Sequence, residues 1–356
     1  MFSAKNYPDH LSPEELDEYL YQGWYRLGQA IFTTQFLFFE SKVFNAIWIR
    51  LGLRDFQFSK SNRKILRTCS NAFQVHYQPL ELTEEKELLY QKYRSDFPGI
   101  LAPSLKESLH EEFPYNIYDS WEVTLRDQGS LIAYSVFDCG KTSIASIIGV
   151  YDPDYRKYSL GMATLLFEIQ YGAANGYEWF YPGYVVPGNP RFDYKLRSGS
   201  TESYDLYSRQ WLPSDLVLSE ILPFERIEQK IMAFSDILTE TGKLHKVIYN
   251  SILEANFYKT EEMEFIDAPC FLLSFDEDPD HQHLAAITYD PHQNRYDCWS
   301  CSVLDNFEPD FWNDLRNRNQ RFMYPAVLFV QEKKLFSAES LVPYIFPIPK
   351  MFFFNY

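Results

Sequence analysis

The sequence predicts an α+β protein, and three observations support this fold class. Three β-type runs separated by hairpin turns follow one another from Trp121 to Tyr151. An apolar helix-type run over 160–175 comes next and leads into another β-type run over 179–184. The chain has 356 residues, of which 46% are hydrophobic, enough for more than one core. This order is typical of a hairpin set joined to a β–α–β unit around a substrate cleft.

The residues before Trp121 predict a mixture of helices and strands. Ser12, followed by proline and two glutamates, favours a helix that ends at Gly23. Residues 31–58 are rich in Phe, Ile and Trp and predict two or three strands. The remaining elements are a strand over 74–79, an amphipathic helix that opens at Thr83, and a loop with a short helix over 95–116.

The last part of the chain predicts helices followed by strands. Residues 213–260 favour helices, and residues 268–304 favour strands with a turn at 290–294. The tail from Tyr324 is apolar and strand-like as far as the aromatic run at 351–354.

Composition limits the partners and the compartment. A net charge of −16 opposes non-specific binding to nucleic acid and to anionic membranes, although a local basic patch would still bind a polyanion. Five cysteines, an odd number, do not predict a disulfide framework. The N-terminus is polar and shows no signal peptide, and the apolar run over 36–53 carries charged residues. We therefore expect a soluble cytoplasmic protein with no membrane partner.

The polar turn between the third strand and the helix at 160–175 is a candidate anion site. The helix begins with small residues, and such an end presents unpaired N–H groups and the positive pole of the helix dipole. Ser159, Leu160 and Gly161 are therefore placed to bind a phosphate or a terminal adenosine. The alternative is that Gly161 only permits close packing of the helix on a strand.

Basic residues concentrate in one segment of this acidic chain. Lys60, Arg63, Lys64 and Arg67 are suited to a tRNA backbone or to an acidic N-terminal side chain. The alternative is a solvated run of charge. Arg26, beside Trp24, either faces an acceptor carboxylate or stacks on an aromatic ring.

Three residues after a proline-rich loop are candidates for catalysis. Lys195 is suited to contact a phosphate or an acceptor carboxylate. Tyr194 or Glu202 could pass an amine proton through water. The alternative is a surface lysine beside a packed tyrosine.

Cys298 and Cys301 form a CxxC pair with His281, His283 and His292 upstream. A second CxxC and a regular histidine spacing are missing, and strand alternation would point the two thiols to opposite faces. We predict no metal here.

Three blocks of sequence resemble the aminoacyl-tRNA–protein transferases, the arginyl- and leucyltransferases of the N-degron pathway. Residues 23–28 are similar to the family's G-[FW]-x-R-x-G, and residues 59–67 to its S-[KR]-S-Q-[RK]-[RK] box. The third block comprises 151–155 with 159–161, followed by 182–184 and 190–195.

The resemblance implies a catalytic domain like that of the GNAT acyltransferases over 115–215. It also implies a substrate-recognition domain over 1–114, while residues 216–356 form an extension without an assigned role. The implied reaction transfers arginine or leucine from aminoacyl-tRNA to a protein or peptide N-terminus, often one with an acidic residue. The tRNA is a co-substrate, and no cofactor is implied. The implied substrate-binding residues are Trp24, Arg26, Ser59, Lys60, Ser61, Asn62, Arg63, Lys64, Arg67, Asp152, Tyr155, Ser159, Leu160 and Gly161. The implied catalytic residues are Tyr194, Lys195 and Glu202.

The chain departs from the family at two places. Relatives usually carry a cysteine cluster linked to a metal or iron–sulfur site, and residues 28–68 contain no cysteine. The family's Y-K-x-x-[FY]-x-P-x-E keeps its tyrosine, lysine and glutamate here, but Ser198 and Ser200 replace the aromatic residue and the proline.

The chemistry of an aminoacyl ester is compatible with this residue set. The ester is already activated, and an acceptor α-amine with a pKa near ~7.7–8.0 is partly neutral in the cell. Catalysis then needs positioning, proton removal and oxyanion stabilisation, but no Ser–His or Cys–His nucleophile. Residues 121–215 contain no histidine. An acyl-CoA N-acyltransferase and a non-catalytic N-degron binding module remain as alternatives.

Overall fold

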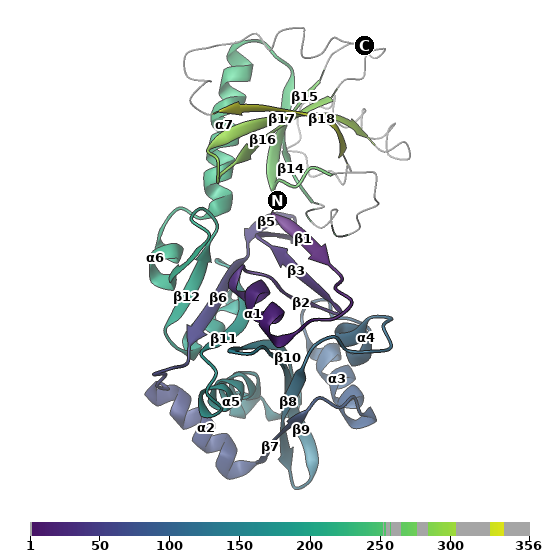
Figure 1. The fold of residues 1–356 in the computed structure, drawn as a ribbon, viewed down its shortest axis with the longest axis vertical. Helices are drawn as coiled ribbons and strands as arrows, with labels where there is room; N and C mark the ends of the chain where they lie inside the picture. Colours follow the sequence, from purple (N-terminus) through teal and green to yellow (C-terminus); the bar gives the residue numbers. More distant parts are fainter. Residues whose placement is uncertain are drawn as a thin grey trace.

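The structure is a computed structural model that describes residues 2–251, 253, 257, 265–275, 284–303 and 328–337. Its largest sheet has eight strands in the order β13-β12-β6-β11-β10-β9-β8-β7 (Figure 1). Their bounds are β6 Ile47–Gly52, β7 Gln74–Pro79, β8 Ser120–Asp127, β9 Ser130–Cys139, β10 Ser143–Tyr151, β11 Trp179–Val185, β12 Thr201–Asp205 and β13 Gln210–Pro213.

The centre of this sheet confirms the α+β class and the expected order of elements. Strands β8, β9 and β10 are joined as antiparallel hairpins. Helix α5 (Leu160–Ala174) then crosses to β11, which pairs with β10 in parallel. Three antiparallel strands followed by this crossover form the expected β–β–β–α–β unit.

Helices cover both faces of the sheet. On one face α5 packs against α2 (Lys60–Ala72), and apolar residues of both helices meet Leu51, Ile144 and Phe180 of the strands. The other face is covered by α1 (Pro13–Tyr21), α3 (Glu84–Asp96) and α4 (Leu105–His110). The two cores lie on opposite faces because neighbouring strand residues, such as Ile144 and Ala145, alternate between them.

Local capping explains where the helices begin. Ser12 and Glu15 form a capping box at the start of α1, and Thr83 caps α3. The expected helix ending before Gly23 is confirmed, since α1 ends at Tyr21 and Gly23 has a φ of 78°.

The N-terminal residues form two small sheets. One has the order β1-β3-β2, with bounds Ser3–Asn6, Ala30–Thr34 and Tyr25–Leu27, and the other pairs β4 (Phe36–Phe39) with β5 (Lys42–Asn45). Residues 31–58 thus contain four strands or parts of strands instead of two or three, because a turn at Glu40 and Ser41 divides one apolar run into a hairpin.

The C-terminal residues form a separate five-stranded sheet against a long helix (Figure 1). The helices are α6 (Ser214–Ser219) and α7 (Pro223–Glu240). The strands are β14 (His245–Tyr249), β15 (Cys270–Phe275), β16 (Leu284–Asp290), β17 (Arg295–Val303) and β18 (Leu328–Ser337). The turn expected at 290–294 is confirmed as the β16–β17 hairpin, whereas the run at 351–354 lies outside the described residues.

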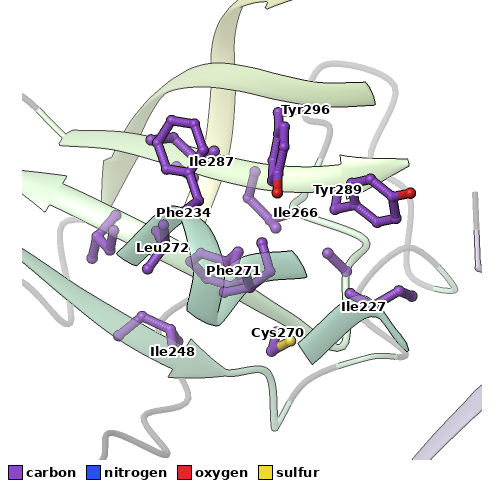
Figure 2. Packing of buried hydrophobic residues seen from close by; sticks show 14 of the residues in the cluster. Ile227, Phe234, Ile248, Ile266, Cys270, Phe271, Leu272, Ile287, Tyr289 and Tyr296 are labelled. Atoms are coloured by element: carbon purple, nitrogen blue, oxygen red, sulfur yellow. The ribbon is translucent and has the colours of Figure 1, made fainter. Parts of the chain in front are cut away.

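The core of this unit lies between α7 and its sheet. Figure 2 shows Ile227 and Phe234 of the helix among Leu272, Ile287 and Tyr296 of the strands. The expectation of mainly helical structure over 213–260 is wrong at β14, because its backbone pairs with that of β15 in an antiparallel ladder.

The chain's N-terminus docks onto the C-terminal unit. The Phe2 ring packs in the core of that unit, and the Phe2 backbone N–H donates to the Asp267 carboxylate. The Ser3 hydroxyl donates to the Leu253 carbonyl (2.5 Å). Burial raises the pKa of Asp267 to about 6.

Two general observations complete the fold. Strands β6 and β7, which precede residue 115, lie in the same sheet as β8–β11, so the expected boundary at 114/115 runs through one sheet.

Among the helices that the structure describes, none is long and apolar enough to cross a membrane.

Candidate functional site

The central sheet opens between its two parallel strands. Strands β10 and β11 pair only over three positions, from Ser143 opposite Trp179 to Ala145 opposite Tyr181. Beyond these positions both strands continue without pairing to each other, and β10 carries a register shift after Ser146. The two strands therefore part beyond Ala145 and Tyr181.

The Tyr25 hydroxyl marks the point where the strands part. It donates to the Tyr181 carbonyl of β11 (2.8 Å) and to the Ser146 carbonyl of β10. The side chain is buried, and burial raises its pKa, with a further contribution from the charge of Glu168. Tyr25 therefore ties the N-terminal sheet to the opening.

Helix α5 begins beside this opening without a side-chain cap. Ser159 has a left-handed backbone with φ 55° and ψ 45°, and its side chain makes no capping hydrogen bond. Close packing explains Gly161, since a Cβ there would lie 3.1 Å from Tyr151 Cε1. The packing alternative therefore holds for Gly161, while the first-turn N–H groups remain suited to an anion.

Asp152 and Tyr155 stabilise the turn that leads into α5. Lys92 of α3 forms ion pairs with Asp152 and with Asp154 (2.6 Å each). The Tyr155 hydroxyl donates to Asp127 in the β8–β9 turn (2.9 Å). These contacts support positioning of the turn, and substrate contact by the two residues stays a prediction.

Lys195 and Tyr194 lie at the edge of the opening, in the loop after β11. The Lys195 ammonium donates to the Tyr184 carbonyl (3.0 Å), and a Cβ on Gly183 would lie 3.1 Å from Lys195 Nζ. Part of the lysine side chain stays accessible, but its ammonium lies among protein atoms, and this desolvation lowers its pKa to about 8. Burial and the charge of Glu168 raise the pKa of Tyr194 to about 12.

Glu202 lies apart from that pair. Its carboxylate accepts from Arg50 Nε on the neighbouring strand (2.7 Å), and the Arg50 guanidinium stacks over Trp179. Arg50 shares its strand face with Trp48, which packs in the core under α1, whereas Tyr194 packs in the core under α5. The sequence grouped Glu202 with Tyr194 and Lys195, whereas the structure packs the Tyr194 ring in the core under α5 and pairs Glu202 with Arg50.

The basic segment forms most of α2. Ser59 accepts from the Asn62 N–H as the N-cap (3.2 Å) and contacts the Ser61 hydroxyl (2.9 Å). Asn62 is buried, and its amide donates to the Arg197 and Ser198 carbonyls (3.0 and 3.1 Å). Asn62 therefore positions the loop that carries Lys195.

The cations of α2 point to solvent. Lys60, Arg63, Lys64 and Arg67 are exposed on this helix, and Arg63 also donates to the Phe58 carbonyl (2.8 Å). Together they form one basic surface, which we call the α2 basic face, suited to phosphates.

Arg26 contradicts the expectation of an accessible acceptor contact. Its guanidinium is buried and donates to Asp138 Oδ1 (2.9 Å), the Ser120 hydroxyl (3.0 Å) and the Leu109 carbonyl (2.6 Å). It also stacks over the Tyr118 ring at 4.4 Å. The aromatic-stacking alternative is therefore correct. The neighbouring Trp24 packs on Tyr19 of α1 with ring centroids 5.7 Å apart.

Glu168 is a buried acidic residue near this opening that the sequence did not single out. Its side chain is completely buried on α5, and neither carboxylate oxygen has a hydrogen-bond partner among the described residues. Burial raises its pKa to about 8. The sequence does contain one indication of its burial, since Glu168 is the one charged residue in the apolar run over 160–174.

The CxxC pair lies in the C-terminal sheet, away from this opening. Cys301 is buried and Cys298 is partly buried, and both pack with the core under α7. In the described part of the chain, no three His, Cys, Asp or Glu side chains are grouped to hold a metal. His281 and His283 lie outside the described residues.

Comparisons with known proteins agree with this geometry. Residues 85–205 match the family model of the arginine-tRNA-protein transferase C terminus. An aspartate/glutamate leucyltransferase of Leptospira interrogans is 29% identical over 194 residues, which cover 53% of this chain and 74% of that protein. The enzyme of the same description from Helicobacter hepaticus is 28% identical over 183 residues, 50% of this chain and 74% of that protein.

Similar solved structures include a GCN5-related N-acetyltransferase-like protein from Streptococcus suis. It has 12% sequence identity and a TM-score of 0.28, and it covers 44% of this chain and 57% of that chain.

Proposed function

Because the chain belongs to the aminoacyl-tRNA–protein transferase family, we propose that it transfers arginine or leucine to protein N-termini that begin with Asp or Glu. The observation that carries this proposal is the opening between β10 and β11, beside the uncapped start of α5. Both elements lie within the matched residues 85–205.

The donor end is assigned to the helix start and the α2 basic face. The Ser159 N–H donates to the Arg156 carbonyl (3.0 Å), so the N–H groups at Leu160 and Gly161 are the ones suited to a phosphate of the tRNA 3′ end. The exposed cations of α2 are suited to the tRNA backbone, and Asn62 connects this helix to the Lys195 loop. Charged tRNA is then the sole co-substrate, and no cofactor takes part.

Lys195 and Tyr194 remain the proposed catalytic residues. With a pKa near 8, Lys195 is partly neutral at cellular pH, so it can contact the acceptor and also accept a proton from its amine. Tyr194 stays protonated and can donate a hydrogen bond. Glu202, which accepts from Arg50, acts through that arginine as a positioning residue.

The test is a panel of arginyl-, leucyl- and lysyl-tRNA with peptides that begin with Asp, Glu or Gly, read by mass spectrometry. We expect addition of one residue to the Asp and Glu peptides from one of the first two tRNAs. Lys195→Ala should lower the rate at least ~100-fold, while the exposed Lys106→Ala should not.

Two other outcomes would overturn the proposal. Acylation with acetyl-CoA instead of charged tRNA would make the protein an acyl-CoA N-acyltransferase. Tight binding of Asp or Glu peptides without turnover from any charged tRNA would make it a binding module.

A further inference from the structure

The Glu168 carboxyl group has no cation among the described residues that would explain its burial. It is completely buried, and both oxygens lack a hydrogen bond within the described residues. Burying a carboxylate is costly unless it is paired, and a stranded one is rarely retained without a use. The side chains that influence its pKa are Ser135, Ser146 and Asp138, none of which is a cation.

The residues around Glu168 are small. The Ser135 hydroxyl of β9 and the Ser146 hydroxyl of β10 approach the carboxyl closely enough to lower its pKa, although neither carboxyl oxygen has a partner in full hydrogen-bond geometry, and the buried Ser135 hydroxyl has none either. Gly149 adds no side chain, and a Cβ there would lie 3.4 Å from Thr164 Oγ1, one helical turn before Glu168. No large side chain of these positions covers the carboxyl.

The carboxyl lies near the point where the two strands part. Ser146, which approaches it, follows the last paired position of β10, and the Ser146 carbonyl accepts from the Tyr25 hydroxyl that bridges the two strands. The charge of Glu168 also raises the pKa of Tyr25 and of Tyr194. Glu168 therefore approaches the opening from the α5 side.

We propose that the Glu168 carboxylate binds the α-ammonium group of the aminoacyl donor. The inference rests on the proposed function and defines the donor class, because a simple acyl group lacks this cation. The α-ammonium is attached one carbon away from the reacting carbonyl, so a charge-assisted hydrogen bond to Glu168 fixes that carbonyl in the opening.

The experiment compares two donors that differ in one group. One is the cognate aminoacyl-tRNA, and the other carries the matching α-hydroxy acid, which has the same side chain and ester but no ammonium. For the unmodified protein we expect kcat/KM to fall by about 10- to 100-fold with the hydroxy-acid donor, the range for one charge-assisted hydrogen bond. In Glu168→Gln this preference should disappear, whereas Glu178→Gln, an exposed control, should keep it.

A proton-acceptor role for Glu168 would give a different result. Glu168→Gln would then slow both donors equally and leave their ratio unchanged, which would overturn the inference. Thermal unfolding of each variant confirms that it is folded.

A binding measurement separates this inference from the proposed function. The probe is an adenosine that carries the amino acid through a stable 3′-amide, titrated by calorimetry beside its α-hydroxy counterpart. Glu168-dependent preference for the amino form supports the inference even if no peptide is modified, an outcome that rejects only the proposed function. Equal affinity for both forms, together with normal transfer, rejects only the inference.

Discussion

Glu168→Gln should remove most of a pH-dependent loss of stability in the protein without ligand. The pKa of Glu168 is raised from its ordinary value of 4.5 to about 8 because the carboxyl is completely buried. The native state therefore binds the proton more tightly than the unfolded chain does. The contribution of Glu168 to the free energy of unfolding is therefore greatest below pH 4.5 and falls as the pH rises towards 8. Over this interval the unfolded chain releases the proton freely, whereas the native state keeps it until the pH approaches 8.

The magnitude follows from the width of this interval. Each unit of pKa difference corresponds to about 1.4 kcal/mol, so the free energy of unfolding should fall by about 3 kcal/mol between pH 5 and pH 8 from this one group. Other groups also titrate in this range. The informative quantity is therefore the difference between Glu168→Gln and the unmodified protein, which should grow by that amount in favour of the variant.

Urea unfolding at pH 5, 6, 7 and 8 measures this difference. Glu178→Gln provides the matched control, since its carboxylate is exposed and paired with Arg54, and its difference should stay flat. A constant difference for Glu168→Gln across all four pH values would refute the reasoning and show that the carboxyl has water or a partner in solution.

Three further predictions concern other parts of the structure. Arg26→Ala leaves Asp138 buried without its cation and should lower the free energy of unfolding in urea by about 3–5 kcal/mol. Arg54→Ala, at an exposed ion pair, should change that free energy very little. Equal losses in the two variants would contradict the argument from burial. Replacing Lys60, Lys64 and Arg67 together by Gln should weaken tRNA binding and lower the slope of log K against log salt by roughly two to three units in fluorescence titrations; an unchanged slope would place the tRNA elsewhere. Extended dialysis against a chelator should leave the transfer rate unchanged, and loss that is restored by zinc would reveal a metal requirement.

Elements with strong local signals could be predicted from the sequence. Ser12 and Thr83 cap their helices as expected, and the strand at 74–79 has the predicted bounds because its neighbours on both sides are helix and turn residues. Strand β14 could not be predicted, because a five-residue segment after a long helix becomes a strand only through its pairing with β15.

The site was harder to predict because burial is decided in three dimensions. Arg26 reads as a binding residue from its position beside Trp24, but Asp138, which binds it, is more than a hundred residues away in the chain. The pairing of Glu202 with Arg50 has the same cause, since it depends on a strand register that the sequence does not state. The sequence proposes Lys195 as a site residue, but it gives no sign that the lysine ammonium is desolvated.

The contacts of Phe2 and Ser3 with Asp267 and Leu253 can form only late in biosynthesis. The partners of this contact are separated by 265 residues for Phe2 and Asp267. At the usual speed of a ribosome, the second partner is made roughly 10–50 s after the first. During that time Phe2 and Ser3 cannot pack against Asp267 and Leu253, so this segment stays accessible to chaperones. Adding an affinity tag to the other end of the polypeptide leaves this late closing step undisturbed.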